Sequence, residues 1–292
     1  MEMHAFLPDV RLAPITWIYG IMDTAMPPVP MTVHQLLVFN LSGAKVTGDA
    51  DGFDAPIAAC AMTEGGRMLG KGEGRMVFVY LLAGTLSRVL GLDATTLTDP
   101  RPVAPGESAA LDAMLAELIK VRDDRGAIVK TIDAHLLDAM RRAPPQGLAE
   151  TANVLLVSPE APSIPETAAR LGVSQRTLER HYKTRYGCPP SRYLRHLRLV
   201  RSTIGGLTNL RWENVPPEIE YSDQSHWLKD MRTIYGATPT QLRNMRIANW
   251  FFYPDGRYDP SDAIDAFVPE ENKMRIAAWK ASREELVADL PG

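Results

Sequence analysis

The first hundred residues alternate between short apolar runs and turn-forming stretches. Three apolar runs of strand length lie at residues 15–21, 33–41 and 76–82, and the stretches 47–56 and 64–74 are rich in Gly and other turn formers. Short apolar runs with glycine-rich breaks favour strands over helices. This pattern predicts a β-rich N-terminal region.

From Ser108 onward the apolar positions take the period of a helix. They recur at spacings of three and four residues within 111–119, and at every fourth residue from Ile128 to Met140. Such spacing places them on one helical face, so two helices are expected after the sheet. The proline- and glycine-containing segment 144–149 then interrupts the pattern and is assigned as a linker.

Beyond the linker the chain is predicted to be helical, and two of its segments repeat at an offset of 49 residues. Ser174 aligns with Asp223 and Gly187 aligns with Gly236, while the core, basic and aromatic positions between them keep their class. Two copies of one such unit indicate a duplicated supersecondary structure rather than a solenoid.

The first copy has the local chemistry of a helix-turn-helix. Pro165 opens a short helix over 166–171, Gly172 supplies the backbone freedom for a tight turn, and Ser174 is a natural N-cap for the next helix. In that second helix Leu178 and Tyr182 point to the core. Arg176, Glu179, Arg180 and Lys183 share the opposite face.

A basic face on one helix is more often solvated surface than a binding site, so the distribution of charge matters. The chain has a net charge of -3, but residues 151–247 carry 14 Lys and Arg against 8 Asp and Glu, a net charge of +6. Residues 1–150 and 248–292 are both acidic, with net charges of -5 and -4. The basic block, the duplication and the turn chemistry together favour binding to a polyanion.

Two separated motifs, in matching order and spacing, carry a family resemblance. AARLGVSQRTLERHYK at 168–183 is followed by YLRHLRL at 193–199, and YSDQSHW at 221–227 is followed by YGATP at 235–239. These motifs resemble the DNA-binding domain of AraC/XylS-type transcriptional regulators. The resemblance implies two helix-turn-helix units joined by a long helix over about 191–204, with both recognition helices in successive major-groove segments of double-stranded DNA. Carried over by position, the DNA-facing residues are Gln175, Arg176, Glu179, Arg180, Lys183, Gln224, Ser225, His226, Lys229 and Arg232.

The second unit departs from the family pattern before its recognition helix. Pro216 and Pro217 prevent a helix from running through them, and Glu220 stands where the family has a turn glycine. A short or distorted first helix is expected there, with weaker contacts to DNA than in the first unit. The departure leaves an alternative open, namely a protein-interaction module with little specific DNA binding.

These features predict an α+β protein. A mixed, β-rich N-terminal domain with two following helices is expected at 1–143, the linker at 144–149, an all-α double helix-turn-helix domain at 150–247 and an acidic extension at 248–292. The extension contains the aromatic cluster 250–253, which needs a covering surface, and its acidity suggests competition with DNA for the basic block.

The N-terminal region resembles, more weakly, the sensor-like domain of AraC-like regulators. Such a domain implies ligand sensing or dimerisation, so the expected partners besides DNA are a small-molecule effector, a second copy of the chain and RNA polymerase. Five aromatic residues in apolar runs either line a ligand pocket or, as is more common, belong to the core: Trp17, Tyr19, Phe39, Phe78 and Tyr80.

Other chemistry has little support in the sequence. Gly65 to Gly72 nearly spells a phosphate-binding loop, but Gly72 replaces the magnesium-binding hydroxyl and a strand follows where a helix is needed. The histidines show no metal-binding spacing. Cys60 is expected to be buried, and Cys188, next to a turn glycine, is expected nearer the surface. We therefore expect no enzyme, cofactor, metal or membrane segment, and a cytoplasmic location.

Overall fold

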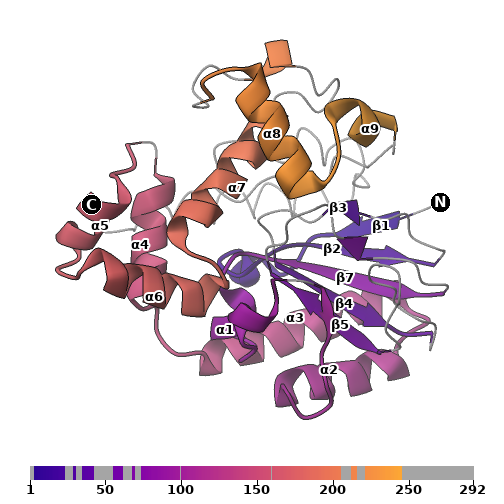
Figure 1. The fold of residues 1–292 in the computed structure, drawn as a ribbon. Helices are drawn as coiled ribbons and strands as arrows, with labels where there is room; N and C mark the ends of the chain where they lie inside the picture. The colour runs from indigo at the N-terminus through magenta and orange to yellow at the C-terminus, as the bar shows by residue number, and fades with distance from the viewer. Residues whose placement is uncertain are drawn as a thin grey trace.

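The computed structural model describes residues 3–23, 29–30, 35–42, 55–61, 68–69, 74–98, 100–158, 160–204, 212–215 and 221–244. Its N-terminal part is built on a six-stranded antiparallel sheet (Figure 1). In spatial order the strands are β1 (Met3–Phe6), β2 (Thr16–Met22), β7 (Met76–Leu81), β4 (Gln35–Asn40), β5 (Ile57–Cys60) and β8 (Arg101–Pro102). The short strands β3 (Val29–Pro30) and β6 (Met68–Leu69) pair separately.

The central strands are buried on both faces, which explains why their sequences are continuous apolar runs rather than alternating ones. Every residue of β4 and β7 is buried. Their antiparallel register pairs Leu37 with Val79 and Phe39 with Val77. The sheet is therefore the middle layer of the molecule.

Two helices cover the first face of the sheet. They are α2 (Ala109–Lys120) and α3 (Arg125–Arg142), and Figure 1 shows both beneath the strands. Leu111 and Ile132 from these helices share one apolar cluster with Tyr19 and Phe39 from the sheet. Asp124 caps α3 by accepting a hydrogen bond from the Ala127 backbone N–H at 3.0 Å.

The second face of the sheet shares an apolar cluster with the C-terminal helices. Phe78 and Tyr80 from β7 belong to the same cluster as Tyr186, Leu197 and Trp227. The helices are α4 (Leu148–Val157), α5 (Ile164–Arg170), α6 (Gln175–Tyr186), α7 (Pro190–Ile204), α8 (Gln224–Tyr235) and α9 (Pro239–Asn244). Short elements connect the parts: η1 (Val10–Leu12), α1 (Thr85–Arg88), η2 (Ala94–Thr96) and η3 (Trp212–Asn214).

The predicted α+β class is confirmed, with the sheet in the N-terminal part and helices alone in the described C-terminal part. The three predicted strands occur within two residues of their expected bounds, and the two expected helices follow the sheet, with α3 starting three residues before Ile128. The surface position expected for Cys188 is wrong, because the chain turns directly from α6 into α7 and leaves this side chain 1% exposed. Residues 216–220, most of the glycine-rich loop at 65–72 and the extension from 245 onward lie outside the described residues.

Candidate nucleic-acid interface

Local capping fixes the geometry of the first helix-turn-helix. Ser163 and Glu166 form a capping box at the start of α5, in which Glu166 accepts from the Ser163 backbone N–H at 2.8 Å. The hydroxyl and backbone hydrogen bonds from Ser163 lower the pKa of Glu166. Gly172 has a φ of 67° in the turn, and the Ser174 hydroxyl caps α6 by accepting from Thr177 N–H at 3.1 Å. These short-range contacts confirm the predicted turn and cap.

Helix α6 separates an aromatic face from a basic one. Leu178, Tyr182 and Tyr186 are buried. Tyr182 donates a hydrogen bond to Asn153 of α4 at 2.7 Å, and burial raises the pKa of its phenol. These contacts orient the helix so that its opposite face meets solvent. On that face lie the five side chains predicted to meet DNA, with Glu179 half-exposed and the others exposed: Gln175, Arg176, Glu179, Arg180 and Lys183.

Two of these five already contact each other. The Gln175 amide donates to the Glu179 carboxylate at 2.8 Å, one helical turn away. This bond restrains both side chains at the start of the helix, and it neutralises no cation. The Arg176, Arg180 and Lys183 side chains are exposed on the same face.

The second unit repeats this arrangement on α8. Asp223 takes the place of the capping serine and accepts from His226 N–H at 2.8 Å, while Trp227, Met231 and Ile234 are buried. Of the predicted contact residues, the His226 ring packs edge-on against Tyr221, with centroids 5.1 Å apart. The other four are exposed: Gln224, Ser225, Lys229 and Arg232.

A buried carboxylate joins α8 to the long helix α7, and the sequence reading did not find it. Asp230 is 1% exposed, and its carboxylate pairs with Arg195 at 2.7 Å and with Arg198 at 3.7 Å. The Tyr221 hydroxyl donates to it at 3.2 Å, and Arg198 lies 5.0 Å from the centre of the Tyr221 ring. Two arginines of the positively charged block, Arg195 and Arg198, thus hold the second unit together rather than face DNA.

A buried hydrogen bond adds to this junction. The Trp227 indole N–H donates to the Ser202 hydroxyl at 2.9 Å, and that hydroxyl donates to the Leu199 carbonyl oxygen at 2.7 Å. Together with the Asp230 network, it fixes α8 against α7 at positions from Arg195 to Ser202.

The C-terminal end of α6 is anchored to the sheet part of the molecule. Arg185 forms an ion pair with Glu150 of α4 at 2.6 Å and donates to the Ser87 hydroxyl of α1 at 3.4 Å. One residue past the helix, Gly187 has a φ of 82°, and a Cβ built there would lie 2.5 Å from the Ala94 carbonyl oxygen of η2. The recognition helix therefore meets α1 and η2 directly.

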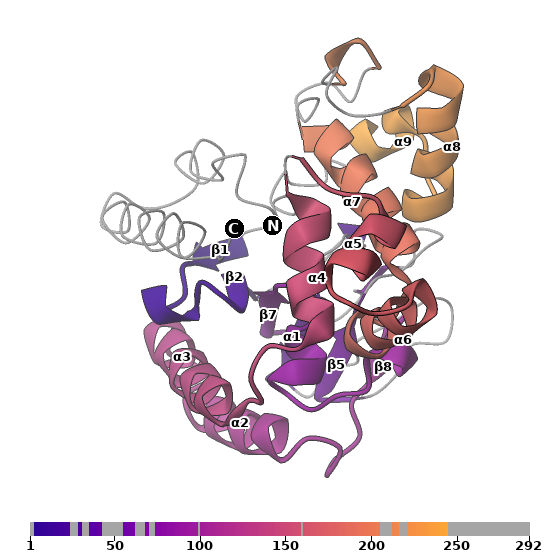
Figure 2. The same cartoon turned by 90° about the vertical axis from the view of Figure 1, so that its left-hand side faces the viewer.

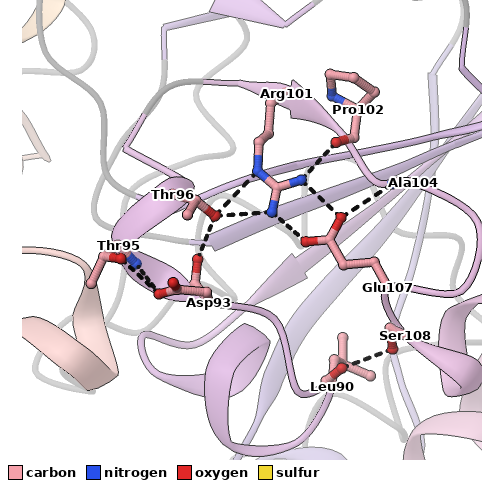
Figure 3. A network of polar contacts seen from close by, with 9 residues as sticks. All are labelled: Leu90, Asp93, Thr95, Thr96, Arg101, Pro102, Ala104, Glu107 and Ser108. Carbon is pink, nitrogen blue, oxygen red and sulfur yellow. Dashed lines mark hydrogen bonds and ion pairs between the residues drawn. The ribbon is translucent and has the colours of Figure 1, made fainter.

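A polar network stabilises η2, the element that Gly187 approaches (Figure 3). The Arg101 guanidinium donates to the Thr96 hydroxyl at 2.9 Å and forms an ion pair with Glu107, which raises the arginine pKa and lowers the carboxyl pKa. Thr96 in turn donates to the Asp93 carbonyl oxygen at 2.8 Å. The network ties η2 to β8 and to the loop before α2.

The five aromatic residues predicted as ligand-pocket or core residues lie in the strands of the sheet. Tyr19 and Phe39 are buried on the face covered by α2 and α3, while Phe78 and Tyr80 are buried on the opposite face. The Trp17 backbone lies in β2, and its side chain is outside the described part. The four described side chains therefore belong to two different apolar clusters, one on each face of the sheet.

The described residues also bear on the other kinds of site considered from the sequence. Across the described ranges, no group of three or more His, Cys, Asp or Glu side chains is arranged to hold a metal ion. Cys60, predicted to be buried, is 0% exposed. None of the helices in the described ranges has the length and hydropathy needed to cross a bilayer.

Two capped helices, α6 and α8, each expose a polar and basic face, and α6 follows α5 and a tight turn in the helix-turn-helix arrangement of DNA-binding domains. Residues 167–245 match the family model described as a helix-turn-helix domain. This region is an AraC-type helix-turn-helix domain, as its motifs predicted.

Solved structures show a distant similarity over most of the chain. The apo form of a ToxT variant from Vibrio cholerae aligns with a TM-score of 0.41 and 9% identity over 78% of this chain and 97% of that chain. Unsaturated fatty acid bound wild-type ToxT from the same organism aligns with a TM-score of 0.40 and 8% identity over 79% of this chain and 94% of that chain. The sequence matches no curated protein.

Proposed function

We propose that this chain is a sequence-specific DNA-binding transcriptional regulator of the AraC/XylS type, which acts by binding and without turnover. The observation that carries the proposal is the exposed basic face of α6, in a region that matches a helix-turn-helix domain and repeats in α8. Arginine on such a helix suits bidentate contacts to guanine, while the remaining basic side chains suit contacts to phosphate.

The proposal assigns a role to each part of the chain. Residues 150–247 bind DNA, and residues 1–143 respond to an effector or a second copy of the chain. Residues 144–149 link these two parts. The direct contacts of α6 with Ser87 and Ala94 support this assignment, since a change in the N-terminal part would reach the recognition helix through them. RNA polymerase is a further proposed partner of the DNA-bound chain, and the cytoplasm is its proposed location. The acidic extension at 248–292 is proposed to compete with DNA for the basic block.

Fluorescence anisotropy tests the proposal with the full chain, its own upstream DNA and a scrambled duplex of equal length, across a salt series. Tighter binding to the native duplex, with affinity falling as salt rises, is the expected result. If neither duplex binds at low salt, the proposal is wrong and the protein-interaction module becomes the better interpretation.

Arg180→Ala tests whether this side chain reads a base. We expect it to cost about 1–3 kcal/mol of binding to the native duplex and to reduce discrimination against the scrambled one. Arg170→Ala removes the same charge from α5, outside the predicted interface, and controls for net charge. Equal losses on both duplexes would show that Arg180 contacts only phosphate.

A further inference from the structure

A cavity of about 280 Å³ lies where the first recognition helix meets the N-terminal part. Its walls come from Ser87 of α1, residues 147–150 at the start of α4, and Arg180, His181, Thr184 and Arg185 of α6. Figures 1 and 2 both show α1, α4 and α6 meeting at this place. The cavity is small for a drug-sized molecule and suits a compact ligand.

The charge of the lining favours an anion. Arg185 and Glu150 pair with each other, and Glu150 is the only carboxylate in the lining. The Arg180 and His181 side chains are exposed, and neither has a hydrogen bond or ion pair with another residue of the described ranges. Two donor side chains thus border the cavity, and the carboxylate in its lining is already paired with Arg185, which leaves these donors for a carboxylate or phosphate group.

The cavity is also better placed than the sheet to take an effector. The described aromatic residues that the sequence offered as pocket-forming are packed into apolar clusters on opposite faces of the sheet. The cavity, by contrast, joins α1 of the N-terminal part to the helix predicted to read DNA. A ligand seated there would contact both.

We propose that this cavity is the binding site of a small anionic effector, a carboxylate or a phosphate compound, held by Arg180 and His181. Its regulatory consequence rests on the proposed function. Arg180 cannot contact the ligand and a DNA base at the same time, so ligand and DNA compete for this side chain. By linkage, each then weakens the binding of the other by the same factor.

Binding is tested without DNA, by calorimetric titration of the full chain with inorganic phosphate and with succinate, each against chloride at equal ionic strength. We expect saturable binding of at least one of the two. His181→Ala should raise its Kd about tenfold, as expected for the loss of one hydrogen bond to a charged group.

Lys183→Ala is the matched control, because Lys183 is an exposed base on the same helix but does not line the cavity. Its Kd for the anion should stay within about twofold of the wild-type value, since Lys183 makes no contact with the cavity and solvent screens its exposed charge. Equal losses in the two variants, or no saturable binding of either probe, would overturn the site.

A second arm measures DNA affinity with and without the bound probe at constant ionic strength. A rise in the Kd for the native duplex in the wild-type chain, which in His181→Ala requires about tenfold more probe, supports competition at Arg180. An unchanged DNA affinity at saturating probe overturns the competitive mechanism. Anion binding without any DNA binding would contradict the proposed function while leaving the cavity site standing, so the two failures are distinguishable.

Discussion

Asp230 is the residue on which the attachment of the second unit to α7 depends. Replacing it with Asn leaves Arg195 and Arg198 without their carboxylate, and the side chains of both arginines are only 32% exposed. Removing one partner of a buried ion pair is strongly destabilising because the other charge stays uncompensated. Since solvent reaches the two arginines, we expect Asp230→Asn to lower the free energy of unfolding by about 2 kcal/mol, measured by urea denaturation.

Asp138→Asn provides the control for this prediction. Asp138 pairs with Arg142 at 2.6 Å on α3, but both side chains are about half-exposed or more. Exposed pairs of this type contribute less than about 1 kcal/mol. If the two variants lose equal stability, the Asp230 network is not a structural junction.

Asp23 should make the stability of the N-terminal part depend on pH. Hydrogen bonds from Arg75 and Arg125 lower its pKa to about 2 from an ordinary value of 3.8. Between these values the unfolded chain binds more protons than the folded one, so stability rises with pH across that interval. The stabilisation is complete above pH 4 and is lost as the pH falls toward 2.

Asp23→Asn removes this titration, and thermal unfolding of both proteins at several pH values tests it. We expect the variant to be less stable than the wild type at pH 5, with the difference in Tm shrinking between pH 4 and pH 2. A difference that stays constant over this range would contradict the assignment.

At the scale of elements, comparing two glycines separates the effect of the contact between α6 and η2 from the effect of backbone strain alone. Gly187 and Gly172 both have left-handed φ values, 82° and 67°. A Cβ at Gly172 meets nothing within 4 Å, while a Cβ at Gly187 meets the Ala94 carbonyl oxygen at 2.5 Å. Gly172→Ala should cost about 1 kcal/mol, the penalty of a left-handed alanine.

Gly187→Ala should cost about 1–3 kcal/mol more, because the end of α6 must also move away from η2. Urea denaturation of the two variants measures the difference. In anisotropy, Gly187→Ala should also weaken binding to the native duplex more than Gly172→Ala does. Equal effects on stability and on DNA binding would show that η2 does not constrain the recognition helix.

The elements themselves were predictable where local rules decide them. The caps at Ser174 and Asp223 and the apolar period of α2 and α3 depend on residues a few positions apart, and the structure confirms them. The junctions were not predictable, because they join distant positions. Arg195 and Asp230 are 35 residues apart in the chain, and Ser87 and Arg185 are 98 residues apart. A single sequence shows Arg195 only as one more base in a positive block, so its structural role appears only once the helices are packed.

At the scale of the whole molecule, the question is whether both helix-turn-helix units engage DNA at once. Although the chain has a net charge of -3, its two recognition helices expose five Lys and Arg side chains, three on α6 and two on α8: Arg176, Arg180, Lys183, Lys229 and Arg232. Each Lys or Arg side chain that neutralises a phosphate adds about 0.9 to the magnitude of the slope of the logarithm of the DNA-binding constant against the logarithm of the salt concentration. The salt dependence therefore counts the contacts that each unit makes.

The double variant Lys229→Ala/Arg232→Ala removes the two exposed basic side chains of α8 and leaves α6 unchanged. If both units bind, the slope should become shallower by about 2 and affinity should fall on native and scrambled DNA alike, because phosphate contacts carry little sequence information. Anisotropy over a salt series measures this, with Asp138→Asn as a variant of unrelated surface charge. An unchanged slope would mean that the first unit binds alone, and α8, held on α7 by Asp230, would then be free for a protein partner.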